Sequence, residues 1–259
     1  MPRTLIPLDV AKHADLRFDA SQPFHFAKSD MLCPVVSGEL RQMARDYVIV
    51  FPMEGGLPQA LLGVDQGVNA YVAESGHWLC RYVPAHYRRH PFYAVPKPSQ
   101  GASTERIYAI GIDEHAPHLS RDQGQALFGS AGDETVTLKK IKGALSSLEK
   151  DSTLTMKMVA ELEKNELLIP QNFHVKTVTG EERGVTGFRG VDSKKLMALE
   201  PQALGGLQKS GALFLAYAHL ISLANLRDGV LVRGTDTAQE IQESGVAIDS
   251  GDIDLSFLN

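Results

Sequence analysis

Short apolar runs separated by turn residues fill the first half of the chain. They predict strands at 46–53, 59–65, 69–73, 77–83 and 106–113. The first two runs flank a Glu-Gly-Gly turn at 54–56 and form a hairpin pattern. In the run 77–83 the residues alternate, so that Trp78, Cys80 and Tyr82 share one side of the predicted strand.

The apolar spacing changes to a helical period in the middle of the chain. Apolar residues recur three, four and three positions apart at Leu138, Ile141, Leu145 and Leu148. This spacing predicts an amphipathic helix over 134–150 with lysines on its other face. Helical spacing resumes up to 168, after a break expected at 151–153. The helix 134–150 could pack on its own sheet or on another subunit, which would make the protein a homo-oligomer.

The last third contains a second hairpin pattern and more helices. Residues 173–191 predict two strands around a Thr-Gly-Glu-Glu turn. Helices follow over 192–226, with Asp192 as an N-cap and Pro201 in a first helical turn. His219 lies in an apolar helical stretch and is expected to be a hydrogen-bonded core residue.

The order of these elements predicts the fold class. Strands come first, then helices, then a hairpin, then helices again, without regular βαβα alternation. This order favours an α+β fold with a mainly antiparallel β-sheet and helices packed on one side. The sheet is expected to be built mostly from residues 30–115 and 170–191.

The length of 259 residues fits one large domain or two small ones, and we expect a single domain over 1–259. The chain is 43% hydrophobic and 22% charged, and its net charge of -5 argues against general nucleic-acid binding. No apolar run reaches the length of a transmembrane helix, and charged residues interrupt the N-terminus where a Sec signal would be apolar. A cytoplasmic location is expected, with export without a Sec signal as the alternative.

The C-terminal end is strongly acidic. After Arg233 there are six carboxylate side chains and no lysine or arginine. A flexible, solvated acidic tail at about 234–259 is the expected structure, because charge blocks of this kind remain in water. The more specific alternative is a tail that serves in docking or export.

The stretch "YVPAHYRRHPFYAV" is the most distinctive part of the sequence. Cations and aromatic residues alternate there without any carboxylate between Ser75 and Thr104. The candidate ligand- or partner-binding residues are Trp78, Arg81, Tyr82, His86, Tyr87, Arg88, Arg89 and Phe92. Guanidinium groups bind carboxylates and phosphates and stack on aromatic rings, so a protein partner or a small anionic or sugar ligand fits this composition. A purely structural corner and a catalytic site are the alternatives.

No metal or other cofactor is predicted. His77, His86 and His90 could share a face only in a helix, and Pro84 and Pro91 disfavour a long one. The two cysteines, Cys33 and Cys80, have no zinc-ligand spacing, and we interpret both as core residues. The common phosphate-loop, nucleophile-elbow and zinc-protease motifs do not occur in the sequence.

The stretch "LLGVDQGVNAYVAESGHWLCRYVPAHYRRHPF" resembles the SapC family, whose pattern is a "GxxxGxN" turn, a tryptophan and then "YVPxxxRRYPF". The matching residues are Gly63, Gly67, Asn69, Trp78, Tyr82, Val83, Pro84, Arg88, Arg89, Pro91 and Phe92. The helical stretch after "GFRGVD" is similar as well, so the resemblance covers about 30–226. His90 and the pair Tyr47–Val48 depart from the family pattern, which has tyrosine at the first position and tyrosine-proline at the second.

The resemblance implies a bacterial protein associated with surface-layer or outer-surface functions, and it implies no catalytic residue or cofactor. The leading hypothesis is therefore a non-enzymatic binding or accessory protein of a surface-layer or outer-membrane uptake or export system. The alternatives are an enzyme acting on a carbohydrate or other anionic small molecule, and a secreted structural component of a surface layer.

Overall fold

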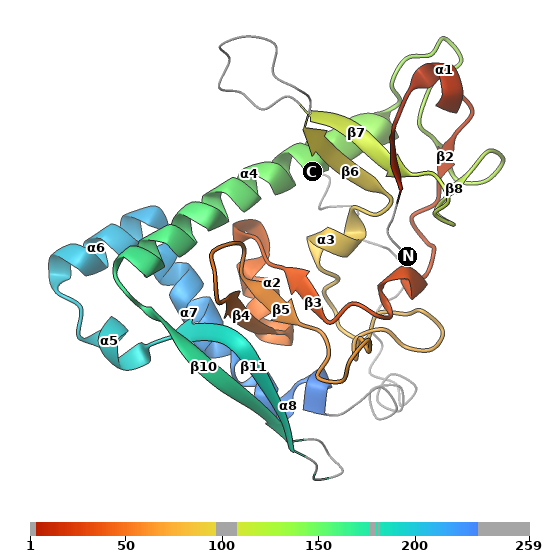
Figure 1. Ribbon diagram of the computed structural model, residues 1–259. Helices are drawn as coiled ribbons and strands as arrows, with labels where there is room; N and C mark the ends of the chain where they lie inside the picture. Colours follow the sequence, from red (N-terminus) through yellow and green to blue (C-terminus); the bar gives the residue numbers. More distant parts are fainter. Residues whose placement is uncertain (1–3, 97–107, 177–179, 181, 233–259) are drawn as a thin grey trace. The chain divides into compact units, whose positions relative to one another are not determined.

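A computed structural model describes residues 4–96, 108–176, 180 and 182–232 (Figure 1). Within these residues the chain divides into two compact units. The first unit contains 4–22, 88–96 and 108–149, and the second contains the described residues from 23 to 87 and from 150 to 232. The acidic tail lies outside the described residues, and the single domain over 1–259 stays a prediction.

The second unit is built on a five-stranded antiparallel sheet in the order β10-β11-β4-β5-β3. Its strands are β3 (Leu32–Pro34), β4 (Val48–Pro52), β5 (Gln59–Leu61), β10 (Leu168–Lys176) and β11 (Glu182–Val191). Both predicted hairpins are confirmed, because β4 pairs with β5 and β10 pairs with β11. The combination of antiparallel sheets with several helices confirms the α+β prediction.

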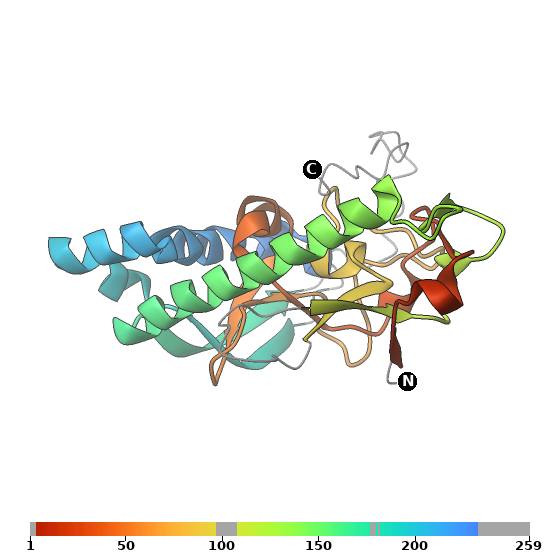
Figure 2. The same cartoon turned by 90° about the horizontal axis from the view of Figure 1, so that it is seen from above.

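Helices lie on one face of this sheet (Figure 2). They are α2 (Leu40–Asp46), α5 (Ser193–Met197), α6 (Pro201–Ser210), α7 (Ala212–Ser222) and α8 (Asn225–Asp228), with short 3-10 turns η1 (His25–Ala27) and η2 (Ser37–Glu39). The predicted start signals are confirmed: the Asp192 side chain accepts from the first backbone N–H groups of α5, and Pro201 opens α6. Helices α2 and α7 pack against each other and against β4.

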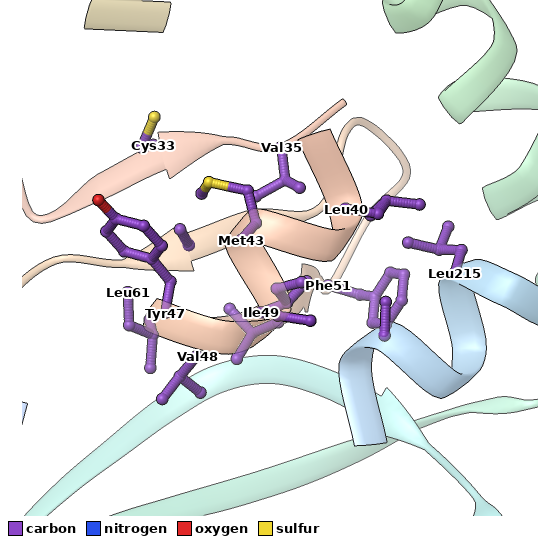
Figure 3. Close-up of a cluster of buried hydrophobic side chains, with 14 of the residues drawn as sticks. Cys33, Val35, Leu40, Met43, Tyr47, Val48, Ile49, Phe51, Leu61 and Leu215 are labelled. Atoms are coloured by element: carbon purple, nitrogen blue, oxygen red, sulfur yellow. The ribbon is translucent and has the colours of Figure 1, made fainter. Parts of the chain in front are cut away.

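The core of the second unit surrounds β4. Val48, Ile49, Val50 and Phe51 are all fully buried, which is typical of a strand covered on both faces. Side chains from α2 and from Leu215 of α7 close over this strand (Figure 3). The uninterrupted apolar run that predicted a strand therefore marks the centre of the unit.

Three polar side chains on the C-terminal helices stabilise the backbone beside β4. His219 donates through Nδ1 to the Ile49 carbonyl (2.7 Å) and accepts through Nε2 from the Val191 N–H (3.1 Å). The Ile49 N–H donates to Ser222 Oγ at 2.9 Å, and the Asn225 amide donates to the Tyr47 carbonyl at 2.9 Å. These side chains give the buried backbone groups hydrogen-bond partners. The prediction that His219 is a hydrogen-bonded core residue is confirmed.

One continuous helix, α4 (Val136–Lys164), replaces the two predicted helices. The break expected at 151–153 is wrong. Thr155 donates from Oγ1 to the Asp151 carbonyl at 2.6 Å, and it also accepts from the Ser37 N–H at 2.7 Å. Tertiary contacts therefore hold polar residues in a helix that their intrinsic propensities disfavour.

The predicted strands at 69–73 and 77–83 are also wrong. They form a compact loop in which only Val72 and Trp78 pair as an isolated bridge. The Asn69 side chain donates to the Ala27 carbonyl (3.0 Å) and accepts from the Tyr71 N–H (2.9 Å). Hydrogen bonds to the buried Asn69 amide thus take the place of the hydrogen bonds to a neighbouring strand that the prediction required.

The first unit contains two small antiparallel sheets, in the orders β1-β7-β6 and β8-β2-β9. Its elements are β1 (Leu5–Pro7), α1 (Val10–His13), β2 (Arg17–Phe18), β6 (Phe92–Pro96), β7 (Tyr108–Asp113), β8 (Leu119–Ser120), β9 (Gln125–Ala126) and the first half of α4. Leu138, Ile141 and Leu145 are buried, as the helical stripe predicted. The sheet expected from 30–115 and 170–191 does not include β6 and β7, because β6 pairs with β7 and β7 pairs with β1.

Candidate functional site

The 78–92 segment runs through a loop, a single helical turn and the start of β6. The helical turn is α3 (Ala85–Arg88), which follows a backbone hydrogen bond from the Tyr87 N–H to the Pro84 carbonyl. The prediction that prolines prevent a long helix here is confirmed. Residues up to Tyr87 belong to the second unit, and residues from Arg88 onward belong to the first.

Two aromatic side chains of the segment, Trp78 and Tyr87, lie in the core of the second unit, and Tyr82 is half-buried. Trp78 is 7% exposed and Tyr87 is 1% exposed, with their ring centres 5.0 Å apart. The ring of Phe24 meets the Trp78 ring edge-on at 5.6 Å. These rings therefore serve mainly as a rigid apolar base for the segment, and little of them is available to a ligand.

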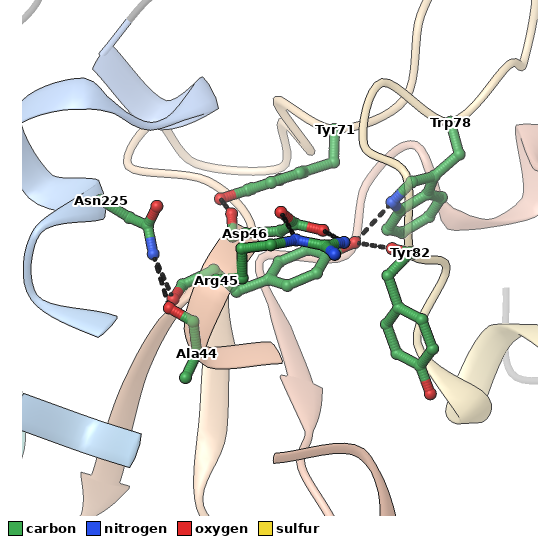
Figure 4. Close-up of polar contacts among 8 residues, drawn as sticks. Ala44, Arg45, Asp46, Tyr71, Trp78, Tyr82 and Asn225 are labelled. Carbon is green, nitrogen blue, oxygen red and sulfur yellow. Dashed lines mark hydrogen bonds and ion pairs between the residues drawn. The ribbon is translucent and has the colours of Figure 1, made fainter. Parts of the chain in front are cut away.

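A chain of hydrogen bonds fixes this base to the residues between α2 and β4 (Figure 4). The Trp78 indole donates to the Tyr47 hydroxyl at 2.6 Å, and that hydroxyl donates to the Tyr82 carbonyl. The Tyr71 ring stacks on the Tyr47 ring at 4.6 Å, and its hydroxyl donates to the Asp46 carbonyl. Burial raises the pKa of both tyrosines well above their ordinary value, so both hydroxyls remain protonated donors at neutral pH.

A buried carboxylate holds the other side of the segment. Glu39, at the end of η2, is 3% exposed. Its Oε2 accepts from the Tyr82 hydroxyl at 2.9 Å and from the Ala85 N–H at 2.8 Å. Sequence reasoning missed Glu39 because a single acidic residue so far along the chain from the segment carries no local signal.

The exposed cation of the segment in the second unit is Arg81. His86 is half-buried, and its ring meets the Tyr87 ring edge-on at 5.4 Å. Arg81 therefore reaches solvent from a loop that is fixed by the neighbouring Trp78 and Tyr82. Such an arrangement can present a guanidinium to an anionic group with little loss of conformational entropy.

The remaining candidate residues lie in the first unit. Arg88 and Arg89 are half-buried, and the Arg89 guanidinium lies 4.8 Å from the centre of the Tyr93 ring. Phe92 is buried and meets Phe18 edge-on at 5.0 Å. Phe92 is thus a core residue like Trp78 and Tyr87, whereas the two arginines keep part of their surface in water.

Two buried histidines lie close to this part of the segment. The rings of His90 and His118 meet edge-on with their centres 4.8 Å apart. His90 Nδ1 and the Tyr93 hydroxyl share a hydrogen bond of 3.0 Å. Burial lowers the pKa of His118 to about 4, although Asp19 opposes the shift. His118 is therefore neutral at physiological pH.

The residues of the "GxxxGxN" turn also have structural explanations. A Cβ on Gly63 would lie 1.8 Å from the Val68 carbonyl oxygen, so only glycine fits there. Gly67 has a positive φ of 71°, which favours glycine for conformational reasons. With the buried amide of Asn69, the motif positions the loop that leads to Trp78.

Both cysteines lie in the described part of the chain, and neither forms a disulfide. Cys33 is buried in the core of the second unit, and Cys80 packs against that core, which agrees with the interpretation of both as core residues. Among the described residues, no group of three or more His, Cys, Asp or Glu side chains is arranged to hold a metal ion. None of the described helices is long and apolar enough to cross a membrane.

A family model described as SapC matches residues 8–228, which is most of the chain. No curated protein and no solved structure matches.

Proposed function

Because this chain belongs to the SapC family, we propose that it is a non-enzymatic binding or accessory protein of a surface-layer or outer-membrane uptake or export system. Its contact surface centres on the 78–92 segment. The observation that supports this most directly is the difference in burial between the aromatic rings and the arginines of the segment. Its aromatic rings pack into the cores, while Arg81, Arg88 and Arg89 keep surface in contact with water.

Arginines held by a rigid base suit recognition of an anionic group. A guanidinium offers planar donors that match a carboxylate or phosphate, and it retains its charge at any physiological pH. Arg81 follows directly on the Trp78 anchor, and Arg88 ends the helical turn that Glu39 fixes through Ala85. The ligand class is therefore a carboxylate- or phosphate-bearing small molecule, or an acidic segment of a protein partner.

The pKa shifts in the second unit favour binding over acid–base catalysis. A general acid or base works best with a pKa near the operating pH. Here burial raises the pKa of Tyr47 and Tyr71 and lowers that of His219 to about 4, so each moves away from neutrality. These groups act as fixed hydrogen-bonding partners of the fold.

Thermal-shift measurements test the proposal. The probes are inorganic phosphate, citrate, glucose, glucose 6-phosphate, ATP and divalent metal salts. A ligand that binds only the folded state raises the melting temperature by mass action. We expect stabilisation by an anionic probe, no stabilisation by neutral glucose, and loss of the effect in Arg81→Ala. Lys164→Ala, which removes an exposed cation on α4, is the control and should retain the effect.

Arg88 and Arg89 are tested by a double substitution to lysine, which keeps the charges but removes the planar fork. Stabilisation should weaken while the protein remains folded. Stabilisation that is unchanged in both arginine variants would rule out the segment as the contact surface. An anionic probe that NMR shows to be chemically converted by the purified protein would overturn the non-enzymatic assignment.

A further inference from the structure

A second surface of the protein lies on the outer side of the helical layer. Helix α7 exposes three large apolar side chains at positions i, i+3 and i+7: Phe214 (46% exposed), Tyr217 (47%) and Ile221 (64%). The opposite side of α7 is buried and carries Leu215, His219 and Ser222. We call the three exposed residues the α7 stripe. An apolar stripe of this kind on a soluble surface is typical of an interaction site.

Exposed cations, which we call the basic rim, lie on the helices that neighbour α7. Helix α2 packs against α7 and exposes Arg41 and Arg45. Exposed Lys209 lies near the end of α6, just before α7, and exposed Arg227 lies in α8, just after it. Helices α2, α6, α7 and α8 thus carry four cations.

The same four helices carry only two carboxylates, Asp46 and Asp228. Asp46 is mostly buried and is paired with Arg45 at 2.6 Å. This local excess of positive charge contrasts with a whole-chain net charge of -5. Four cations minus two carboxylates leave these helices with a net excess of two positive charges, which favours an anionic partner.

We propose that the α7 stripe and its basic rim dock on the surface of an anionic lipid bilayer. Aromatic and aliphatic side chains insert at the boundary between headgroups and acyl chains, and arginine and lysine side chains bind the anionic headgroups. Helix α7 has 11 residues, about 16 Å of helix, so it would lie in the interface without crossing it. A second copy of this chain fits less well, because two basic rims would face each other.

This inference concerns a different surface and a different ligand class from the proposed function, so either can fail without the other. The first measurement is flotation of the full chain with vesicles of phosphatidylglycerol or of phosphatidylcholine. We expect binding to the anionic vesicles, weak binding to the zwitterionic ones, and loss of binding as salt screens the headgroups.

Substitutions locate the contact. Phe214→Glu with Ile221→Glu should lower the vesicle partition coefficient by roughly tenfold or more. Arg41→Gln with Lys209→Gln should lower it by several-fold, roughly in line with the loss of two charges near the surface. Val68→Glu is the matched control, because Val68 is 47% exposed in the loop after β5. It should leave binding unchanged.

A tryptophan reporter shows which residue enters the lipid. The natural Trp78 is buried and is the single tryptophan of the chain, so its emission is a constant background. Phe214→Trp should shift to the blue with anionic vesicles and be quenched by brominated lipid, whereas Val68→Trp should show neither effect. Absence of binding to anionic vesicles, or equal binding to both vesicle types, would overturn the proposal. So would a dimer that the Phe214→Glu, Ile221→Glu variant dissociates in a protein that binds no lipid.

Discussion

The 78–92 segment and helix α7 distribute polar and aromatic side chains in opposite ways. In the segment, Trp78 and Tyr87 face the core and Arg81 faces water. In α7, the polar His219 and Ser222 face the core, while Phe214 and Tyr217 face water. Both arrangements occur in the same unit of the same protein.

Backbone hydrogen bonding explains the difference. Beside α7, the N–H and carbonyl groups of Ile49 and the N–H of Val191 hydrogen-bond to side chains of the helix. Beside the segment, the Tyr47 hydroxyl needs a donor and an acceptor, which the Trp78 indole and a backbone carbonyl supply. Buried polar groups require partners, so the demand for hydrogen bonds decides which residues face inward.

The largest expected effect comes from removing an inward aromatic ring. Trp78→Ala should lower the free energy of unfolding by about 3–5 kcal/mol, because it leaves a cavity and deprives the Tyr47 hydroxyl of its donor. Denaturant unfolding followed by circular dichroism measures the change. Trp78→Phe should lose less, since it keeps most of the ring volume. Equal stability of Trp78→Ala and the native protein would end the structural interpretation of this residue.

The matching experiment on α7 removes an inward polar side chain. His219→Leu should cost about 2–4 kcal/mol, because the Ile49 carbonyl and the Val191 N–H then remain buried without partners. Ser222→Ala should lower the free energy of unfolding by less, about 1–2 kcal/mol, because it leaves one buried backbone group without a partner. Trp78 fluorescence follows unfolding of the second unit in both variants. If His219→Leu leaves the free energy of unfolding unchanged, hydrogen bonding is not the reason that His219 faces inward.

The His219 contribution should also depend on pH. Its Nε2 accepts from the Val191 N–H, so a protonated ring would place two donors against each other. Burial lowers its folded pKa to about 4, below the unfolded value of about 6.5. The stabilisation is therefore full above pH 6.5 and falls progressively as the pH drops toward 4.

The difference between the folded and unfolded pKa values corresponds to a loss of about 3 kcal/mol in the free energy of unfolding. Urea unfolding of the native protein and of His219→Leu between pH 4 and 7.5, monitored at Trp78, measures it. The stability gap between the two proteins should narrow as the pH falls. A gap that is constant over this range would contradict a neutral, buried His219. Because His118 lies in the other unit, its own titration should affect both proteins equally.

The smallest effects on stability are expected for the outward aromatic residues. Phe214→Ser and Tyr217→Ser should change the free energy of unfolding by no more than about 0.5 kcal/mol, because exposed substitutions remove little packing. The same denaturant series measures them. A loss of more than about 2 kcal/mol in either variant would place that ring in the core and would remove the contrast with Trp78.

Features that depend on neighbours along the chain could be predicted from the sequence. The β4–β5 and β10–β11 hairpins, the buried stripe of α4 and the Asp192 cap each follow from a short stretch of residues. The SapC resemblance was equally visible in the sequence, and the family match confirms it. The candidate site was predicted only as a set of residues, and its role as a binding surface stays a prediction.

The failed predictions share one cause. Short apolar runs suggested strands at 69–73 and 77–83, but this stretch is a loop held by the Asn69 amide and the isolated Val72–Trp78 bridge. Polar residues suggested a break at 151–153, but contacts of Thr155 with Ser37 belong to a continuous helix. In both places a partner that is distant in sequence overrides the local propensity.

The local elements, the α+β class and the family could be inferred from the amino-acid sequence, because periodicity, capping and turn chemistry act over a few residues. The division of the described strands into three sheets and the choice of side chains that face inward depend on contacts between distant parts of the chain. The hydrogen bond from the Ile49 N–H to Ser222 Oγ joins residues 173 positions apart. No local pattern encodes such a pair, because the need for a buried backbone group to find a partner arises only once the chain has folded around it.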